Sequence, residues 1–122
     1  MTLDWNRGAL AEGLACYNRG GFFLSHEHWE SVWLTLEEPE KSFLQALIQV
    51  TAAFHHLDMG NSTGALSLLR RAMRRLYLGP AHFGGIAVKP LCAEISEWML
   101  AIERGSSPLP ATHPQILPLN HD

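Results

Sequence analysis

The chain has 122 residues, of which 47% are hydrophobic and 17% are charged, and its formal net charge is −3. This length predicts a single domain with a buried core, and the low charge content excludes a largely disordered chain. No uncharged segment is long enough for a membrane span, and the N-terminal residues lack the apolar stretch of a signal peptide. Cys16 and Cys92 lack the close spacing of a zinc motif or a disulfide framework, so we expect a soluble, cytoplasmic protein.

Glycine, proline and asparagine residues divide the chain into segments with helical periodicity. Gly60 suits a left-handed helix end, Asn61 suits the cap of the following helix, and no segment alternates as a strand does. We therefore predict an all-α fold for residues 1–104, a compact bundle of about five helices around a central buried helix. The predicted helices cover approximately residues 4–18, 22–36, 39–59, 62–78 and 88–104.

The last segment, residues 105–122, contains four of the seven prolines and cannot form a helix. A frayed tail is one interpretation. Its leucine and isoleucine side chains are too apolar for a solvated linker, so we favour an extended strap that lies over the bundle or docks on a neighbouring chain.

The second predicted helix places polar residues among aromatic ones. In a helical projection, His26 lies near the middle of a broad apolar arc, Glu30 lies beside it and Glu27 lies at its margin. A buried glutamate needs a cation, a hydrogen-bond donor, a metal ion or a proton. His26 and Glu30 are four residues apart, so they can contact each other or share one ligand.

The third predicted helix has no charged residue between Ser42 and Leu57, which is typical of a central, buried helix. Its polar residues Gln45, Gln49 and His56 form a narrow stripe. Because the second and third helices are joined by a short connection, we expect them to pack antiparallel and the stripe to face His26 and Glu30. His55 is expected to point elsewhere.

Two interpretations of this cluster are open. The first is a metal site in which His26, Glu30 and His56 bind one divalent ion, zinc or iron, while Glu27 acts as general base. Gln45 and Gln49 would then support the ligands. The second, which spacing alone favours, is a buried hydrogen-bonded network without a cofactor. The HExxE spacing lacks the second histidine of the HExxH zinc helix.

Three groups of residues resemble the signature of the family called domain of unknown function 309. They are Tyr17-Asn18-Arg19-Gly20 with Phe23, His26-Glu27, Trp29-Glu30 and Trp33; Phe43-Leu44-Gln45 with Leu47-Ile48-Gln49, His56-Leu57 and Gly60-Asn61; and Gly64-Ala65-Leu66 with Leu68-Leu69-Arg70-Arg71-Ala72. The resemblance implies a small all-helical bundle of bacterial and archaeal proteins that carries the label of predicted metal-dependent hydrolase. Its characteristic polar residues would be His26, Glu27, Glu30, Gln49 and His56. Leu24 replaces an acidic residue of the pattern, which makes a second metal less expected. Ala46 replaces a glycine, which narrows the close approach of a backbone or ligand to the third helix.

The fourth predicted helix carries Arg70, Arg71, Arg74 and Arg75 opposite its apolar residues. A phosphate or nucleic-acid contact is conceivable. We favour arginines that offset the helix dipole and keep the helix soluble, so no nucleic-acid partner is expected.

The sequence ranks a scaffold or small-ligand module first and a metal-dependent hydrolase second. The expected partner is a small molecule or a protein, including another copy of the chain, and not a membrane.

Overall fold

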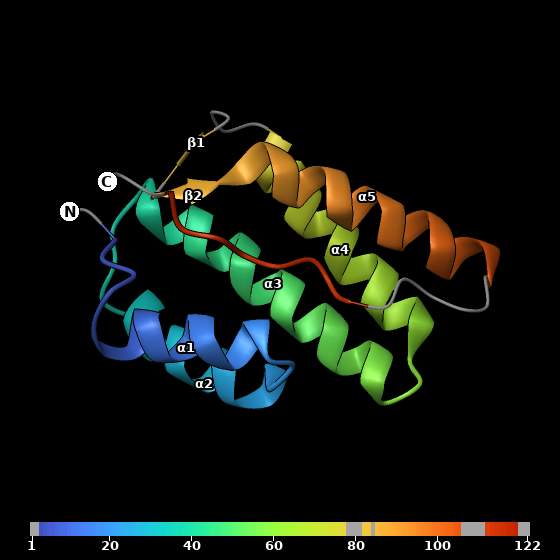
Figure 1. Cartoon of the computed structure of the whole chain (residues 1–122), viewed down its shortest axis with the longest axis horizontal. Coiled ribbons are helices and arrows are strands. Elements are labelled where there is room, and N and C mark those ends of the chain that lie inside the picture. The colour runs from blue at the N-terminus through green and yellow to red at the C-terminus, as the bar shows by residue number, and fades with distance from the viewer. Residues whose placement is uncertain (1–2, 78–81, 84, 106–111, 120–122) are drawn as a thin grey trace.

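The computed structural model describes residues 3–77, 82–83, 85–105 and 112–119. Five helices account for most of these residues, so the predicted all-α fold is confirmed (Figure 1). Two antiparallel strands of two residues each, which the sequence analysis did not predict, lie between the last two helices. The elements are α1 (Gly8–Asn18), α2 (Phe22–Trp33), α3 (Glu40–Asp58), α4 (Ser62–Tyr77), β1 (His82–Phe83), β2 (Ile86–Ala87) and α5 (Val88–Arg104).

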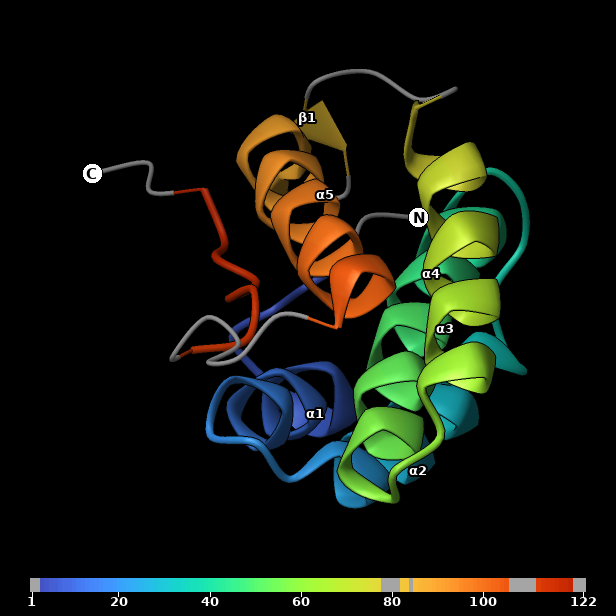
Figure 2. The same ribbon diagram turned by 90° about the vertical axis from the view of Figure 1, so that its right-hand side faces the viewer.

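Helix α3 lies at the centre of the fold. It packs against α2 on one side and α4 on the other, while α1 covers α2 and α5 covers α4 (Figures 1 and 2). Leu44, Leu47 and Val50 of α3 are completely buried. A helix without charged side chains along its middle can accept neighbours on several sides without burying a charge, which explains its central position.

Two helix ends differ from the predicted ones. Helix α1 begins at Gly8 rather than near Asp4, because Gly8 has a left-handed backbone with φ of 67° that a continuous helix cannot contain. Helix α2 ends at Trp33 rather than near Leu36, and one further turn follows it. Gly60 follows α3 with φ of 80°, as predicted for a left-handed helix end.

The described part of the C-terminal segment, residues 112–119, is a strap between α1 and α5 (Figure 2). Tyr17 donates its hydroxyl to the carbonyl of Pro114 at 2.5 Å, and Asn18 exchanges two hydrogen bonds of 2.9 Å with the backbone of Ile116. Ile116 is fully buried, and burial raises the pKa of the Tyr17 phenol. The predicted strap is confirmed for these residues; positions 106–111 and 120–122 lie outside the described residues.

None of the helices in the described ranges is both long and apolar enough to cross a membrane.

Candidate functional site

A cavity of about 250 Å³ lies between α2 and α3, and we call it the α2–α3 pocket. It brings together imidazole, carboxylate and aromatic side chains from two helices that adjoin in sequence. Its lining consists of Phe22, Phe23, His26 and Glu27 from α2 and Ala52, His55 and His56 from α3. Three of the predicted site residues, His26, Glu27 and His56, therefore share one pocket.

The predicted burial of Glu30 is wrong. Its side chain is 54% exposed, and that of His26 is 35% exposed. The buried residues of α2 are Phe22, Ser25 and Trp29, so the inward face overlaps the predicted arc but is shifted toward Ser25. Apolar residues of the arc such as Phe23 instead point outward, with 60% exposure.

The small side chain of Ser25 explains this rotation. Its hydroxyl donates to the carbonyl of Gly13 at 2.8 Å, and Trp29 donates its ring N–H to the carbonyl of Leu10 at 3.2 Å. A serine with a hydrogen-bond partner can be buried without penalty, and it lets α1 approach α2 closely. His26 consequently lies at the edge of the α2 interface, where a pocket can open.

Glu30 orients the His26 ring along the surface of α2. Nδ1 of His26 lies 3.3 Å from Oε2 of Glu30, one helical turn further on. Because a carboxylate can only accept a hydrogen bond, a proton on Nδ1 favours this contact. In a neutral ring with that proton, Nε2 of His26 is an acceptor. Glu30 does not line the pocket itself, so it acts on the pocket only through its contact with the His26 ring.

Asn61 imposes the opposite proton position on His56. The side-chain oxygen of Asn61 accepts the backbone N–H of Gly64 at 2.9 Å, as predicted for the cap of α4. That bond turns the Asn61 amide nitrogen toward Nδ1 of His56, at 3.2 Å. Since an amide NH₂ only donates, Nδ1 of His56 accepts and the ring proton lies on Nε2.

The polar stripe of α3 does not converge on one site. His56 lines the α2–α3 pocket, whereas Gln49 lines a second pocket together with Arg71, Arg74 and Arg75 of α4. Gln45 is half-buried and lines neither pocket. The stripe faces both neighbours of α3 because α2 and α4 flank it, which a projection of one helix does not reveal.

Two residues of this region were not predicted to belong to the site. His55, expected to point elsewhere, lines the α2–α3 pocket with its ring 6.0 Å from that of Phe23. Asn61 was identified as a helix cap, and its second hydrogen bond, to His56, depends on the turn between α3 and α4.

The three predicted metal ligands do not assemble in this arrangement. Among the residues that the structure describes, no group of three histidine, cysteine, aspartate or glutamate side chains is placed to hold one ion. Two contacts give a reason: the Glu30 carboxylate lies beside His26, and Nδ1 of His56 faces a donor. A metal-ligating histidine normally donates its second N–H to an acceptor, so His26 fits this pattern and His56 does not.

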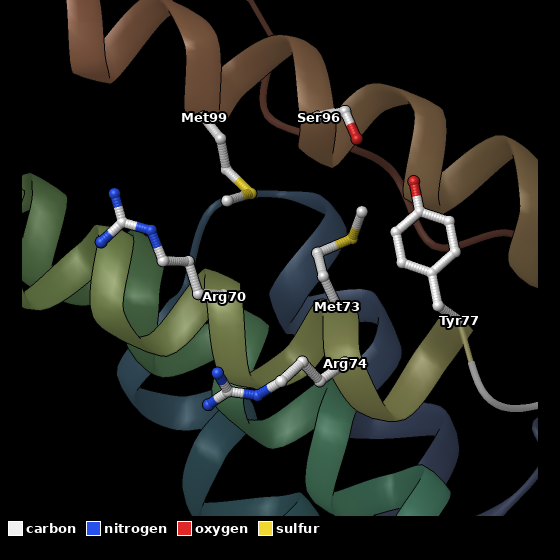
Figure 3. A pocket seen from close by; sticks show the side chains of 6 residues that line it. All are labelled: Arg70, Met73, Arg74, Tyr77, Ser96 and Met99. Carbon is white, nitrogen blue, oxygen red and sulfur yellow. The ribbon is translucent and has the colours of Figure 1, made fainter.

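A larger cleft of about 670 Å³ lies between α4 and α5. Figure 3 shows Met73 and Tyr77 extending from α4 toward α5, from which Met99 extends into the same space, with Arg70 and Arg74 on α4. Arg70 pairs with Glu103 of α5 at 3.5 Å.

Comparison with known proteins confirms the family resemblance. The sequence model of the family described as "Domain of unknown function (DUF309)" matches residues 10–68, which include α2, α3 and the start of α4. An uncharacterized protein of Aquifex aeolicus (strain VF5) is 29% identical over 100 residues, which cover 81% of this chain. The match covers 30% of the length of that relative.

Proposed function

We propose that this protein is a small-ligand-binding helical module whose binding site is the α2–α3 pocket. The observation that carries the proposal is the contrast between two histidines that line the cavity: Nδ1 of His26 lies beside the Glu30 carboxylate, whereas Nδ1 of His56 faces the Asn61 amide nitrogen. His26 offers an acceptor at Nε2, while His56 offers a donor at Nε2. A ligand with both a donor and an acceptor would satisfy the two rings at once.

The remaining lining restricts the shape and charge of the ligand. Phe22, Phe23 and Ala52 supply apolar walls, and Glu27 adds a further acceptor. A cavity of about 250 Å³ suits a small molecule. The chemical class is therefore a compact, planar, uncharged or cationic molecule, such as an aromatic amide.

Benzamide is a suitable probe because its NH₂ group can donate to His26 and its carbonyl can accept from His56. We expect benzamide to cause saturable changes in the side-chain NMR signals of both rings. His26→Gln and His56→Gln should each weaken binding by about tenfold, which corresponds to about 1.4 kcal/mol for one hydrogen bond in a partly buried site.

His28→Gln is the matched control. The His28 side chain is also 35% exposed and lies 3.5 Å from a carboxylate, that of Glu12, but it does not line the pocket. Benzamide binding should be unchanged in this variant. Acetophenone, which lacks the NH₂ donor, should bind more weakly than benzamide. Absence of saturable changes at His26 and His56, or equal losses in all three variants, would refute the proposal.

A metal-dependent hydrolase that uses His26, Glu30 and His56 as ligands and Glu27 as base is the second candidate. The carboxylate-oriented ring of His26 and its shared pocket with Glu27 favour it. The three ligands do not fit one ion as they are arranged, so we derive no catalytic step from it. Near-stoichiometric zinc or iron in protein purified without chelator, lost in His26→Ala but retained in His28→Ala, would support this candidate over the first.

A further inference from the structure

A pocket of about 280 Å³ between α3 and α4 is chemically unlike the α2–α3 pocket. Its lining consists of Gln49 from α3 and Arg71, Arg74 and Arg75 from α4, and we call it the arginine pocket. Neighbouring positions on a helix surface are three or four residues apart, so the three arginines project from the same face. Like charges at this spacing repel one another.

The described carboxylates leave these three arginines without an ion pair. Of the four arginines of α4, Arg70 alone forms an ion pair within the described ranges, with Glu103. Arg75 is close enough to Glu38 to help lower the pKa of that exposed carboxyl, but the two form no ion pair. Placement near the end of α4 offsets the helix dipole, yet it does not explain three cations around one cavity.

Gln49 supplies the second, independent observation. Its side chain is 9% exposed, and its amide oxygen is buried without a hydrogen-bond partner among the described residues. A buried amide oxygen without a hydrogen-bond partner lowers the stability of the fold. The N–H groups of the surrounding arginines are donors that could bond to the Gln49 oxygen. This requires a bound group that holds the mutually repelling arginine side chains together over the pocket.

We propose that the arginine pocket binds a phosphate group, as inorganic phosphate or as a small phosphate monoester. The anion neutralises the repulsion among Arg71, Arg74 and Arg75, and draws their guanidinium groups inward over Gln49. One arginine N–H then donates to the Gln49 oxygen, and the Gln49 NH₂ donates to the anion. Guanidinium groups match phosphate oxygens with paired, charge-assisted hydrogen bonds, which favours arginine over lysine in such sites.

Pocket size and overall charge favour a small ligand over a nucleic acid. The cavity of about 280 Å³ is local, and the net charge of −3 repels an extended polyanion. Arg74 also lines the apolar cleft between α4 and α5, and Figure 3 shows its guanidinium pointing away from Tyr77. An ester with an apolar group could therefore contact both cavities.

NMR titration of the full chain at constant ionic strength tests the proposal with inorganic phosphate and phenyl phosphate as separate probes. We expect saturable shifts of the Gln49 NH₂ and of the arginine side-chain signals at millimolar phosphate. Arg71→Gln and Arg75→Gln should each weaken binding by about tenfold, and Gln49→Leu by about fivefold. Tighter binding of phenyl phosphate would identify an ester as the preferred source of the phosphate group.

Arg70→Gln is the matched control, because Arg70 is on the same helix but does not line the arginine pocket. Its phosphate affinity should remain within about twofold of the wild type. The proposal is overturned if the Gln49 signal does not respond to phosphate, or if Arg70→Gln weakens phosphate binding as much as Arg71→Gln. It is also overturned if a single-stranded oligonucleotide binds far more tightly than phosphate, with a steep salt dependence. Thermal unfolding of each variant separates lost binding from lost folding. Benzamide and phosphate address different pockets, so failure of one proposal leaves the other to its own test.

Discussion

Replacing Asn61 by aspartate should move the ring proton of His56 from Nε2 to Nδ1. In the wild type, the Asn61 oxygen caps α4 through Gly64, and its NH₂ group faces Nδ1 of His56. Aspartate has the same shape but carries an oxygen in place of that nitrogen. The first carboxylate oxygen still accepts the Gly64 N–H, while the second faces His56 and requires a donor there.

The stability changes expected for two substitutions separate the cap from the histidine contact. Asn61→Asp keeps the cap and adds a negative charge at the N-terminus of α4, which contributes about 0.3–1 kcal/mol of stability. Asn61→Ala removes the cap and should cost about 1 kcal/mol. The aspartate variant therefore tests the proton position in a protein that is at least as stable as the wild type.

The assay is a long-range ¹H–¹⁵N NMR experiment, in which the two ring nitrogens of a neutral histidine have distinct shifts. The His56 signals should show an Nε2–H ring in the wild type and an Nδ1–H ring in Asn61→Asp, with the His26 signals unchanged. Benzamide binding should weaken by about tenfold, because both rings would then offer acceptors at Nε2. An Nδ1–H ring in the wild type, or an unchanged ring in the variant, would refute the assignment on which the proposed function rests.

Three further substitutions test the fold around the site. Gly13→Ala would bring a methyl group into steric conflict with the indole nitrogen of buried Trp29. Chemical denaturation should therefore show a net loss of about 1–2 kcal/mol in the free energy of unfolding, despite the better helix propensity of alanine. A higher stability of the variant would contradict the close approach of α1 and α2. Tyr17→Phe should lower the free energy of unfolding by about 1–2 kcal/mol and speed proteolysis of the strap, and an unchanged cleavage rate would argue against its docking. Ser42→Ala should raise the pKa of Glu38 part of the way toward its ordinary value, because the variant loses the hydroxyl hydrogen bond that lowers this pKa most and keeps the one from the backbone N–H. Since this stabilisation is lost as the pH falls through the lowered pKa, the wild-type advantage over Ser42→Ala should vanish in strong acid, and an unchanged carboxyl titration would exclude the contact.

Local sequence signals were sufficient for the helices. Residues such as Gly60 and Asn61 act within one or two turns of their own position, so their effect can be predicted without knowing the neighbours. The uncharged middle of α3 likewise required burial wherever it packed. The His26–Glu30 contact follows from spacing on one helix, and the structure contains it.

Tertiary packing decided which way each helix faces and which polar groups meet. Ser25 is buried and Phe23 is exposed because α1 approaches α2 closely. Hydrophobicity alone would predict a buried Phe23 and an exposed Ser25. The same packing divided the stripe of α3, with His56 facing α2 and Gln49 facing the arginines of α4. Helix formation depends on neighbours within a few residues, whereas the contents of a pocket depend on contacts between segments that the chain brings together only when it folds.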